Sequence, residues 1–250
     1  MFTSQQRAEL RDQLVDAARA DPRITAAAVL GSAAIGGEDP WSDIDLAVRL
    51  DASADQDEVI ADWTRRLYDD HGAVQHLDVH AGGALYRVFL LSSTLPVDLS
   101  FWPDQAFAAS GPTFRLLFGE ANEPTIASAP RPDDLVGMAW LYGLHARSSI
   151  ARGRCLQAVH MINGMRDQVV ALACLRHDVP SSQGRGVDDL PQVIHDRLVD
   201  TLVRSAGRAE LVRSFGATAE LLLDEAQELD QALADSLSEP VRELVRTSGP

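Results

Sequence analysis

Two short motifs near the start of the sequence carry residues that could do chemistry. Gly31 and Ser32 end an apolar run, and Asp43 and Asp45 open the next one after a spacer of ten residues. If residues 43–50 form a strand, the two carboxylates share one of its faces, about 6–7 Å apart, and can reach the same hard cations. The Gly-Ser turn lets backbone N–H groups approach phosphate oxygens and adds a hydroxyl donor. This combination is typical of metal-assisted phosphoryl or nucleotidyl transfer.

A third carboxylate, Asp98, interrupts an otherwise apolar strand pattern at residues 96–102. A bare carboxylate in apolar surroundings is costly, so Asp98 needs a partner. A metal ion held by two other aspartates would be such a partner. Two functional roles are open, a metal ligand or a general base that accepts the proton of an acceptor hydroxyl, and a purely structural role is the alternative.

The order Gly31-Ser32, spacer, Asp43-x-Asp45 resembles the signature of the DNA polymerase β-like nucleotidyltransferase superfamily. The resemblance implies that the Gly-Ser turn holds the β- and γ-phosphates and that Asp43 and Asp45 bind two Mg²⁺ ions. By its position after this strand, Asp98 matches the third carboxylate of the superfamily. The alternative is a hairpin whose two aspartates are merely solvated.

The hydrophobic periodicity of residues 1–102 predicts alternating helices and strands. The predicted helices cover residues 4–20 and 55–70, and the predicted strands cover residues 24–30, 43–50, 74–81, 85–91 and 96–102. A Pro-containing stretch with a short helical piece at 114–118 follows. From residue 133 onward only helical patterns occur, at about 133–151, 156–177, 192–205, 207–235 and 239–246.

These patterns predict an α+β fold with two domains. Residues 1–128 would form a mixed β-sheet flanked by helices, and residues 129–250 a C-terminal α-helical bundle. The resemblance implies that the first is the nucleotidyltransferase catalytic domain and that the second binds the substrate. The first fifty residues, including Ser42-Asp43-Ile44-Asp45, resemble antibiotic nucleotidyltransferases of the lincosamide type and, more distantly, the aminoglycoside type. This resemblance implies an enzyme that transfers a nucleoside monophosphate, AMP if ATP is the NTP, from Mg-NTP to a hydroxyl of a small molecule and releases pyrophosphate. It also places Ser42 beside the nucleotide.

The formal charge of −15 argues against a nucleic-acid-binding scaffold, which needs a basic face. The acidity favours a cationic acceptor or a substrate that arrives with magnesium, although it can also serve solubility alone. All 22 basic residues are arginine, so the resemblance implies that an arginine replaces the lysine that often holds the triphosphate in the family. Arg166 is the candidate, because it lies beside Asp167 within an apolar helical run; a structural ion pair between the two is the alternative.

Several further features are open to more than one interpretation. His76, Asp78 and His80 would share one strand face; we interpret them as lining or rimming the cleft rather than as a metal site, with Leu77 and Val79 in contact with the core.

Two other functions remain open for the protein: nucleotidylation of a protein or an RNA end, and a non-catalytic, antitoxin-like binding module.

Some expectations concern the cellular setting. Cys155 and Cys174 would lie roughly 28 Å apart on one helix, too far for a disulfide, and no signal pattern or membrane span is recognisable. We therefore expect a cytoplasmic protein without membrane or nucleic-acid partners, either a monomer or a homodimer.

Overall fold

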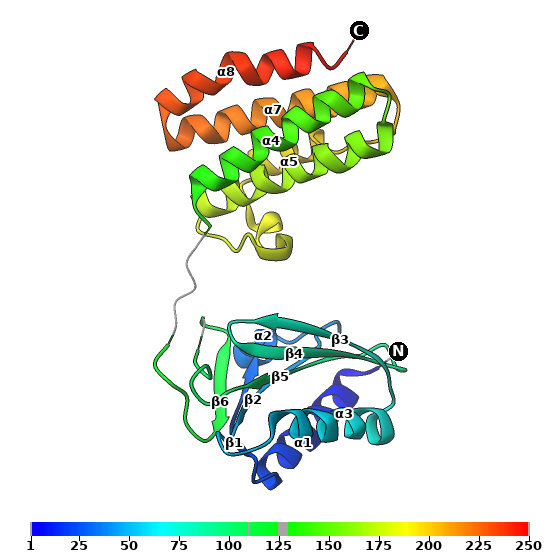
Figure 1. Cartoon of the computed structure of the whole chain (residues 1–250), viewed down its shortest axis with the longest axis vertical. Coiled ribbons are helices and arrows are strands. Elements are labelled where there is room, and N and C mark those ends of the chain that lie inside the picture. The colour runs from blue at the N-terminus through cyan, green and yellow to red at the C-terminus, as the bar shows by residue number, and fades with distance from the viewer. Residues whose placement is uncertain (1, 110, 125–129, 250) are drawn as a thin grey trace. The chain divides into compact units, whose positions relative to one another are not determined.

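The computed structural model describes residues 2–109, 111–124 and 130–249. The chain divides into two compact units, residues 1–128 and 129–250. The predicted domain boundary falls among residues 125–129, which lie outside the described residues. Figure 1 labels the helices and strands of both units.

The N-terminal unit is built on a mixed sheet with the strand order β3-β4-β5-β2-β1-β6. Strands β2 and β5 are parallel, and the other neighbouring pairs are antiparallel. The strands are β1 (Ile24–Leu30), β2 (Ile44–Leu50), β3 (Ala73–Ala81), β4 (Ala84–Leu91), β5 (Pro96–Trp102) and β6 (Phe114–Phe118).

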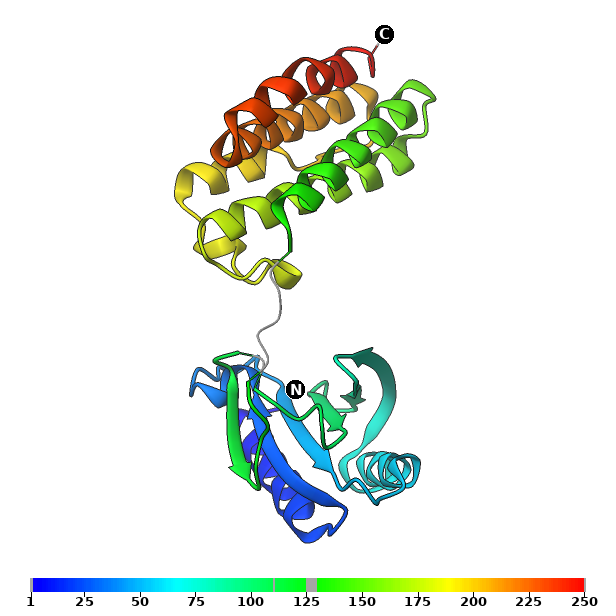
Figure 2. The same ribbon diagram turned by 60° about the vertical axis from the view of Figure 1, so that its left-hand side comes forward.

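Helices α1 (Ser4–Ala20) and α3 (Gln56–His71) cover one face of this sheet (Figures 1 and 2). A capping box at Thr3 starts α1, and the Asp55 side chain accepts two backbone N–H bonds at the start of α3. Leu14 of α1 and Trp63 of α3 are buried in a core with the strand residues that point toward the helices. The boundaries of both helices agree with the sequence prediction to within one residue.

The opposite face of the sheet has small side chains at its centre. Ala28 of β1 and Ala47 of β2 are buried there beneath Phe107, which belongs to the segment that follows β5. Arg49 of β2 holds this segment against the sheet. It forms an ion pair with Asp104 and donates a 2.8 Å hydrogen bond to the Glu120 carbonyl.

The prediction of a helical piece at residues 114–118 is wrong, because these residues form β6. β6 pairs with β1 in antiparallel register, with Leu30 opposite Phe114. The pattern Phe-Arg-Leu-Leu-Phe is compatible with a helix or a strand. These residues form a strand because they pair with the free edge of β1.

The orientation predicted for β3 is also wrong. Leu77 and Val79 are exposed, whereas His76 and Asp78 point toward the helical face. His76 shares a 2.9 Å hydrogen bond with the Tyr68 hydroxyl of α3, and Arg87 of β4 binds Asp78 with two 2.6 Å hydrogen bonds. The polar residues of β3 therefore serve its packing on α3 and neither line nor rim the face with the small side chains.

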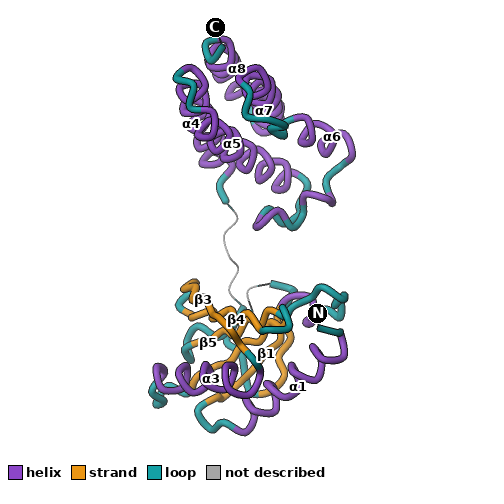
Figure 3. The backbone as a smooth tube through the Cα atoms, turned by 90° about the vertical axis from the view of Figure 1, so that its right-hand side faces the viewer, coloured by secondary structure: helices purple, strands orange, loops and turns teal. Residues whose placement is uncertain are grey.

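The C-terminal unit is a helical bundle (Figures 2 and 3). Helices α4 and α5 run side by side and pack on α7, while α6 and α8 pack against α7 from other sides. A single apolar core joins α4, α5, α6, α7 and α8. The helices are α4 (Pro132–Ala151), α5 (Cys155–Arg176), α6 (Gln192–Asp200), α7 (Arg208–Leu229) and α8 (Gln231–Arg246).

The last predicted helix boundary is displaced. The sequence pattern continues through residue 235, but the chain breaks at Asp230, whose side chain caps α8 by accepting hydrogen bonds from the N–H groups of Ala232 and Leu233. Pro240 then lies inside α8 rather than at the start of a separate helix. An aspartate N-cap is a stronger local signal than a continued apolar stripe.

One carboxylate lies in the core of this bundle. Glu225 of α7 is only 3 % exposed and accepts two hydrogen bonds, at 2.7 and 2.9 Å, from the guanidinium of Arg176 on α5. The same pairing raises the pKa of Arg176 above its ordinary value.

Helix α5 contains both cysteines, and both thiols are free. The helices of the described chain include none that is long and apolar enough to cross a membrane.

Candidate active site

Asp45 and Asp98 lie side by side on the face of the sheet that the helices leave uncovered. β2 and β5 are parallel and pair Asp45 directly with Asp98, so their Cα atoms are about 5 Å apart. Their neighbours Ile44, Leu46 and Val97 point the other way, into the core with α1 and α3. The alternation predicted for these strands therefore brings the two carboxylates onto one face.

Asp43 precedes the first residue of β2 and belongs to the same cluster. The pKa of Asp98 is raised to about 6, mainly because the carboxyl is removed from water and additionally because the negative charge of Asp43 is close. Tyr86 of β4 also faces this cluster. Burial, and then the charge of Asp98, raises the pKa of its hydroxyl.

Asp98 also has an oxygen without a partner. Its Oδ1 is buried and accepts no hydrogen bond from the described residues. Buried polar atoms of this kind are rare in folded proteins, and a catalytic role or a bound ion is among the reasons for them. The negative charge of Asp43 nearby makes this orphaned oxygen more costly still.

The three aspartates fit the magnesium that the sequence implies in their donor chemistry. Carboxylates are hard oxygen ligands, and one of these three holds a buried, unpartnered oxygen. Among the described residues, however, no three His, Cys, Asp or Glu side chains converge as closely as a metal-binding group would. The carboxylates are therefore neighbours on one face without being drawn together around a point.

Gly31 lies against Asp45. It starts the short helix α2 (Gly31–Ala34) with a φ of +58°, a conformation that favours glycine. A Cβ atom at this position would overlap Oδ2 of Asp45. The absence of a side chain at Gly31 therefore makes room for the carboxylate of Asp45. This is a second reason for glycine at this position, besides the close approach of phosphate inferred from the sequence.

The two serines of the predicted nucleotide site differ in their surroundings. Ser32 follows Gly31 in α2, and its carbonyl accepts a 2.9 Å hydrogen bond from the Gly37 N–H. The Ser42 hydroxyl accepts a 2.9 Å bond from the Asp39 N–H and donates to the Asp39 carboxylate at 3.1 Å. Ser42 thus closes the turn that leads into Asp43.

Sequence reasoning missed the residue that holds this turn, Arg7 of α1. Its side chain is almost completely buried, with 4 % of the residue exposed. It donates to the carbonyls of Asp39 at 2.6 Å and Ser42 at 3.1 Å, and to the Glu38 carboxylate at 3.1 Å. Arg7 therefore fixes the backbone immediately before Asp43. Nothing in the spacing of the sequence marked it, because its partners lie more than thirty residues away.

Arg166, the arginine predicted to hold the triphosphate, lies on α5 in the helical unit. It lines a pocket made of residues of that unit alone. Its guanidinium is 3.8 Å from the carboxylate of Asp167. Arg166 belongs to the helical unit, whereas Gly31 and the three aspartates belong to the N-terminal unit, and its predicted role stays a prediction.

Residues 11–94 match the family model of the nucleotidyltransferase domain. This match spans the Gly-Ser turn, Asp43 and Asp45, and it confirms the family and the enzyme class that the two motifs predicted: the chain carries a nucleotidyltransferase domain. The observed architecture, a mixed sheet flanked by helices and followed by a helical bundle, confirms the predicted fold class.

One solved structure similar to the chain is an aminoglycoside 6-adenyltransferase from Bacillus subtilis, with 13 % identity over 98 % of this chain and 99 % of that one and a TM-score of 0.45. No curated protein matches the sequence.

Proposed function

We propose that the protein transfers a nucleoside monophosphate from a magnesium-bound NTP, ATP above all, to a hydroxyl of a small molecule and releases pyrophosphate. The family match supports nucleotidyl transfer. The observation that carries the finer proposal is the in-register pair Asp45 and Asp98, with its unpartnered Asp98 oxygen beside Asp43. We further propose an antibiotic of lincosamide or aminoglycoside type as the acceptor.

In this proposal Asp43 and Asp45 hold magnesium, which would neutralise the phosphates and orient them for in-line attack. The Gly31-Ser32 turn receives the β- and γ-phosphates. The acceptor oxygen forms a bond to the α-phosphorus as the bond between this phosphorus and the leaving pyrophosphate breaks.

Asp98 has two alternative roles in this proposal, general base or metal ligand, and the sequence left both open. A pKa of about 6 suits a general base at neutral pH, where the carboxylate is mostly charged and still accepts a proton readily. As a base it takes the proton of the acceptor hydroxyl on a carboxylate oxygen. As a ligand it offers the buried Oδ1 to the cation instead.

The test is pyrophosphate release with Mg-ATP and the other NTPs, against a panel of lincosamides and aminoglycosides. Asp45→Asn should lower the rate about a thousandfold, because a lost metal ligand removes several kcal/mol of transition-state stabilisation. Asp51→Asn is the matched control: Asp51 follows the last residue of β2 and binds only Ser53 among the side chains of the described chain, so its activity should match the wild type.

Each outcome decides between the functions. Release that requires one acceptor and is lost in Asp45→Asn supports the proposal. Labelling of a protein or RNA from radiolabelled ATP, without a small acceptor, would replace the acceptor class. Calorimetric Mg-ATP binding without any transfer would favour a non-catalytic binding module and contradict the proposal.

A further inference from the structure

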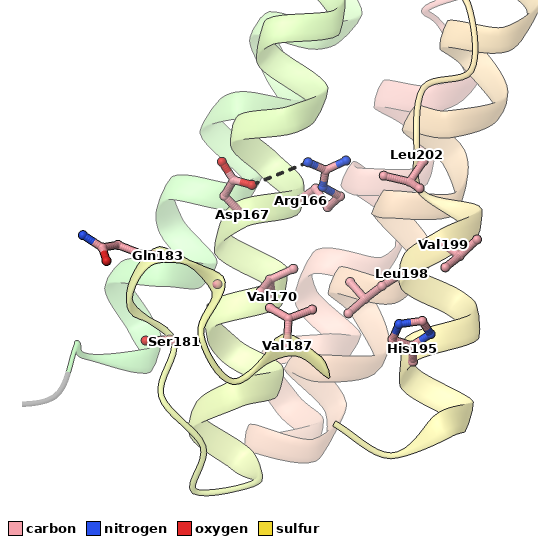
Figure 4. Close-up of a pocket in the computed structure, with 11 residues that line it drawn as sticks. Arg166, Asp167, Val170, Ser181, Gln183, Val187, His195, Leu198, Val199 and Leu202 are labelled. Carbon is pink, nitrogen blue, oxygen red and sulfur yellow. Dashed lines mark ion pairs between the residues drawn. The ribbon is translucent and has the colours of Figure 1, made fainter. Parts of the chain in front are cut away.

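A cavity lies within the helical unit. It has a volume of about 550 Å³ and lies between α5, α6 and the loop that joins them. This volume is in the usual range for a small-molecule site. Figure 4 shows the side chains that surround it, with Arg166 and Asp167 from α5 and His195 from α6 on different sides.

The middle of this pocket is apolar. Val170 of α5, Val187 of the connecting loop and Leu198 of α6 lie around its centre (Figure 4). Val199 and Leu202 extend the apolar lining and remain exposed. A chain of a few methylene groups would cover these side chains and remove them from water, which favours binding.

Arg166 lies at one end of the apolar surface with most of its hydrogen-bonding capacity unused. Its side chain is 23 % exposed, and its ion pair with Asp167 is long, at 3.8 Å. Across the described parts of the chain, no hydrogen bond to its guanidinium occurs. A guanidinium has five N–H donors in a planar fork, so a largely buried one without hydrogen bonds is suited to receive an anion.

The neighbouring charges restrict which anion fits. Asp167 lines the same pocket, and the carboxylate of the exposed Asp188 lies 3.9 Å from the ring of His195, which also lines it. The whole chain carries −15. A multiply charged phosphate would be repelled, whereas a single carboxylate matches the guanidinium with two parallel hydrogen bonds. Asp167 is 67 % exposed, so it can turn to solvent at little cost when a ligand takes its place.

We propose that this pocket binds a small amphipathic monoanion, with its carboxylate on Arg166 and its apolar chain over Val170, Val187 and Leu198. The proposal does not depend on nucleotidyl transfer. It gives Arg166 a role different from the one inferred from the sequence.

The test uses isothermal titration calorimetry on the full chain with three probes of equal chain length: octanoate, octanol and octylammonium. Octanoate should bind at least tenfold more tightly than the other two, since only it makes a charge-assisted pair with Arg166. Arg166→Met, which keeps the apolar stem, should weaken octanoate binding about tenfold and leave octanol unchanged.

A second variant separates the pairing from general folding effects. Asp167→Asn removes the competing carboxylate, so octanoate binding should become tighter by a few-fold. Asp45→Asn should leave octanoate binding as in the wild type, which keeps this proposal distinguishable from the proposed transfer reaction. Equal binding of octanol or octylammonium would overturn the proposal. Displacement of octanoate by metal-free ATP, lost in Arg166→Met, would overturn it as well and return Arg166 to the triphosphate.

Discussion

Each unit of the chain contains a carboxylate that is largely removed from water, and the two differ in whether a positively charged side chain pairs with them. Glu225 in the helical bundle accepts hydrogen bonds from Nε and Nη2 of Arg176. Asp98 in the sheet has a buried oxygen with no partner among the described residues and another negative charge nearby. Burial alone therefore does not distinguish the two sites.

The difference lies in what supplies the counter-charge. In the bundle, the fold supplies it from the adjacent helix, and the pair joins α5 to α7. At the sheet, the negative charge of Asp43 is close to Asp98, and no described residue donates a hydrogen bond to its buried Oδ1. An unpaired buried carboxylate therefore indicates a binding function, while a paired one indicates a structural role.

The largest expected effect is in the bundle. Arg176→Met leaves Glu225 buried and uncompensated, so the free energy of unfolding should fall by about 3–5 kcal/mol. Chemical denaturation of the purified variant measures it. Arg176→Met combined with Glu225→Leu removes both charges and should restore most of the loss; if the double variant is as unstable as the single one, packing rather than the charge explains the effect.

Gly31→Ala should displace Asp45 and lower nucleotidyl transfer about a hundredfold, because an added Cβ overlaps the carboxylate. Gly36→Ala is the matched control. Gly36 has a similar positive φ, +70°, but a Cβ atom there would enter open space, so this variant carries the backbone strain without the displacement. Equal losses of activity in the two variants would show that strain alone is responsible.

Arg7→Met should raise the KM for Mg-NTP about tenfold, as expected for a residue that orients a ligand-bearing turn from behind. Arg11→Met removes a 2.7 Å bond to Glu38 but leaves the bonds from Arg7 to the backbone of the turn in place, and should change KM little. Steady-state kinetics, with kcat and KM separated, makes the comparison. An unchanged KM in Arg7→Met would mean that the turn holds Asp43 without Arg7.

The smallest effect concerns Asp98 in metal-free protein. Its folded pKa of about 6 lies above the ordinary 3.8, so between these pH values the folded chain binds a proton that the unfolded chain has released. The free energy of unfolding should therefore fall as pH rises through this window and stay low above it. Asp98→Asn should abolish this fall and be more stable at pH 7 by about 1–2 kcal/mol. Denaturation in EDTA from pH 4 to 7 measures it; a fall that persists in the variant would assign it to another group.

The elements that carry the aspartates could be predicted from the sequence because local patterns determine them. The strand alternation around Asp45 and Asp98, with apolar neighbours on both sides, fixes their common face. The cap at Asp55 and the break after residue 20 mark the flanking helices. These signals lie within a few residues of the feature that they predict.

Features that depend on distant partners could not be predicted. Residues 114–118 become a strand only because β1 has a free edge. The apolar residues Leu77 and Val79 predict that their face of β3 contacts the core. In the structure the opposite face does so, because His76 packs against the rings of Tyr68 and Phe89. The hydrogen bonds that Arg7 makes depend on the path of the loop before Asp43, and the hydrophobic periodicity of the sequence does not predict this path.

The parallel pairing of β2 and β5 has a consequence for which changes in chain length the protein tolerates. Residues 45 and 98 meet across two strands that are joined through α3, β3 and β4. Residues added to the β3–β4 turn would leave that pairing unchanged. One residue inserted before Asp98 within β5 would rotate its carboxylate to the helix side, among Leu46 and Leu99. Added residues are therefore tolerated at the β3–β4 turn and not inside these two strands.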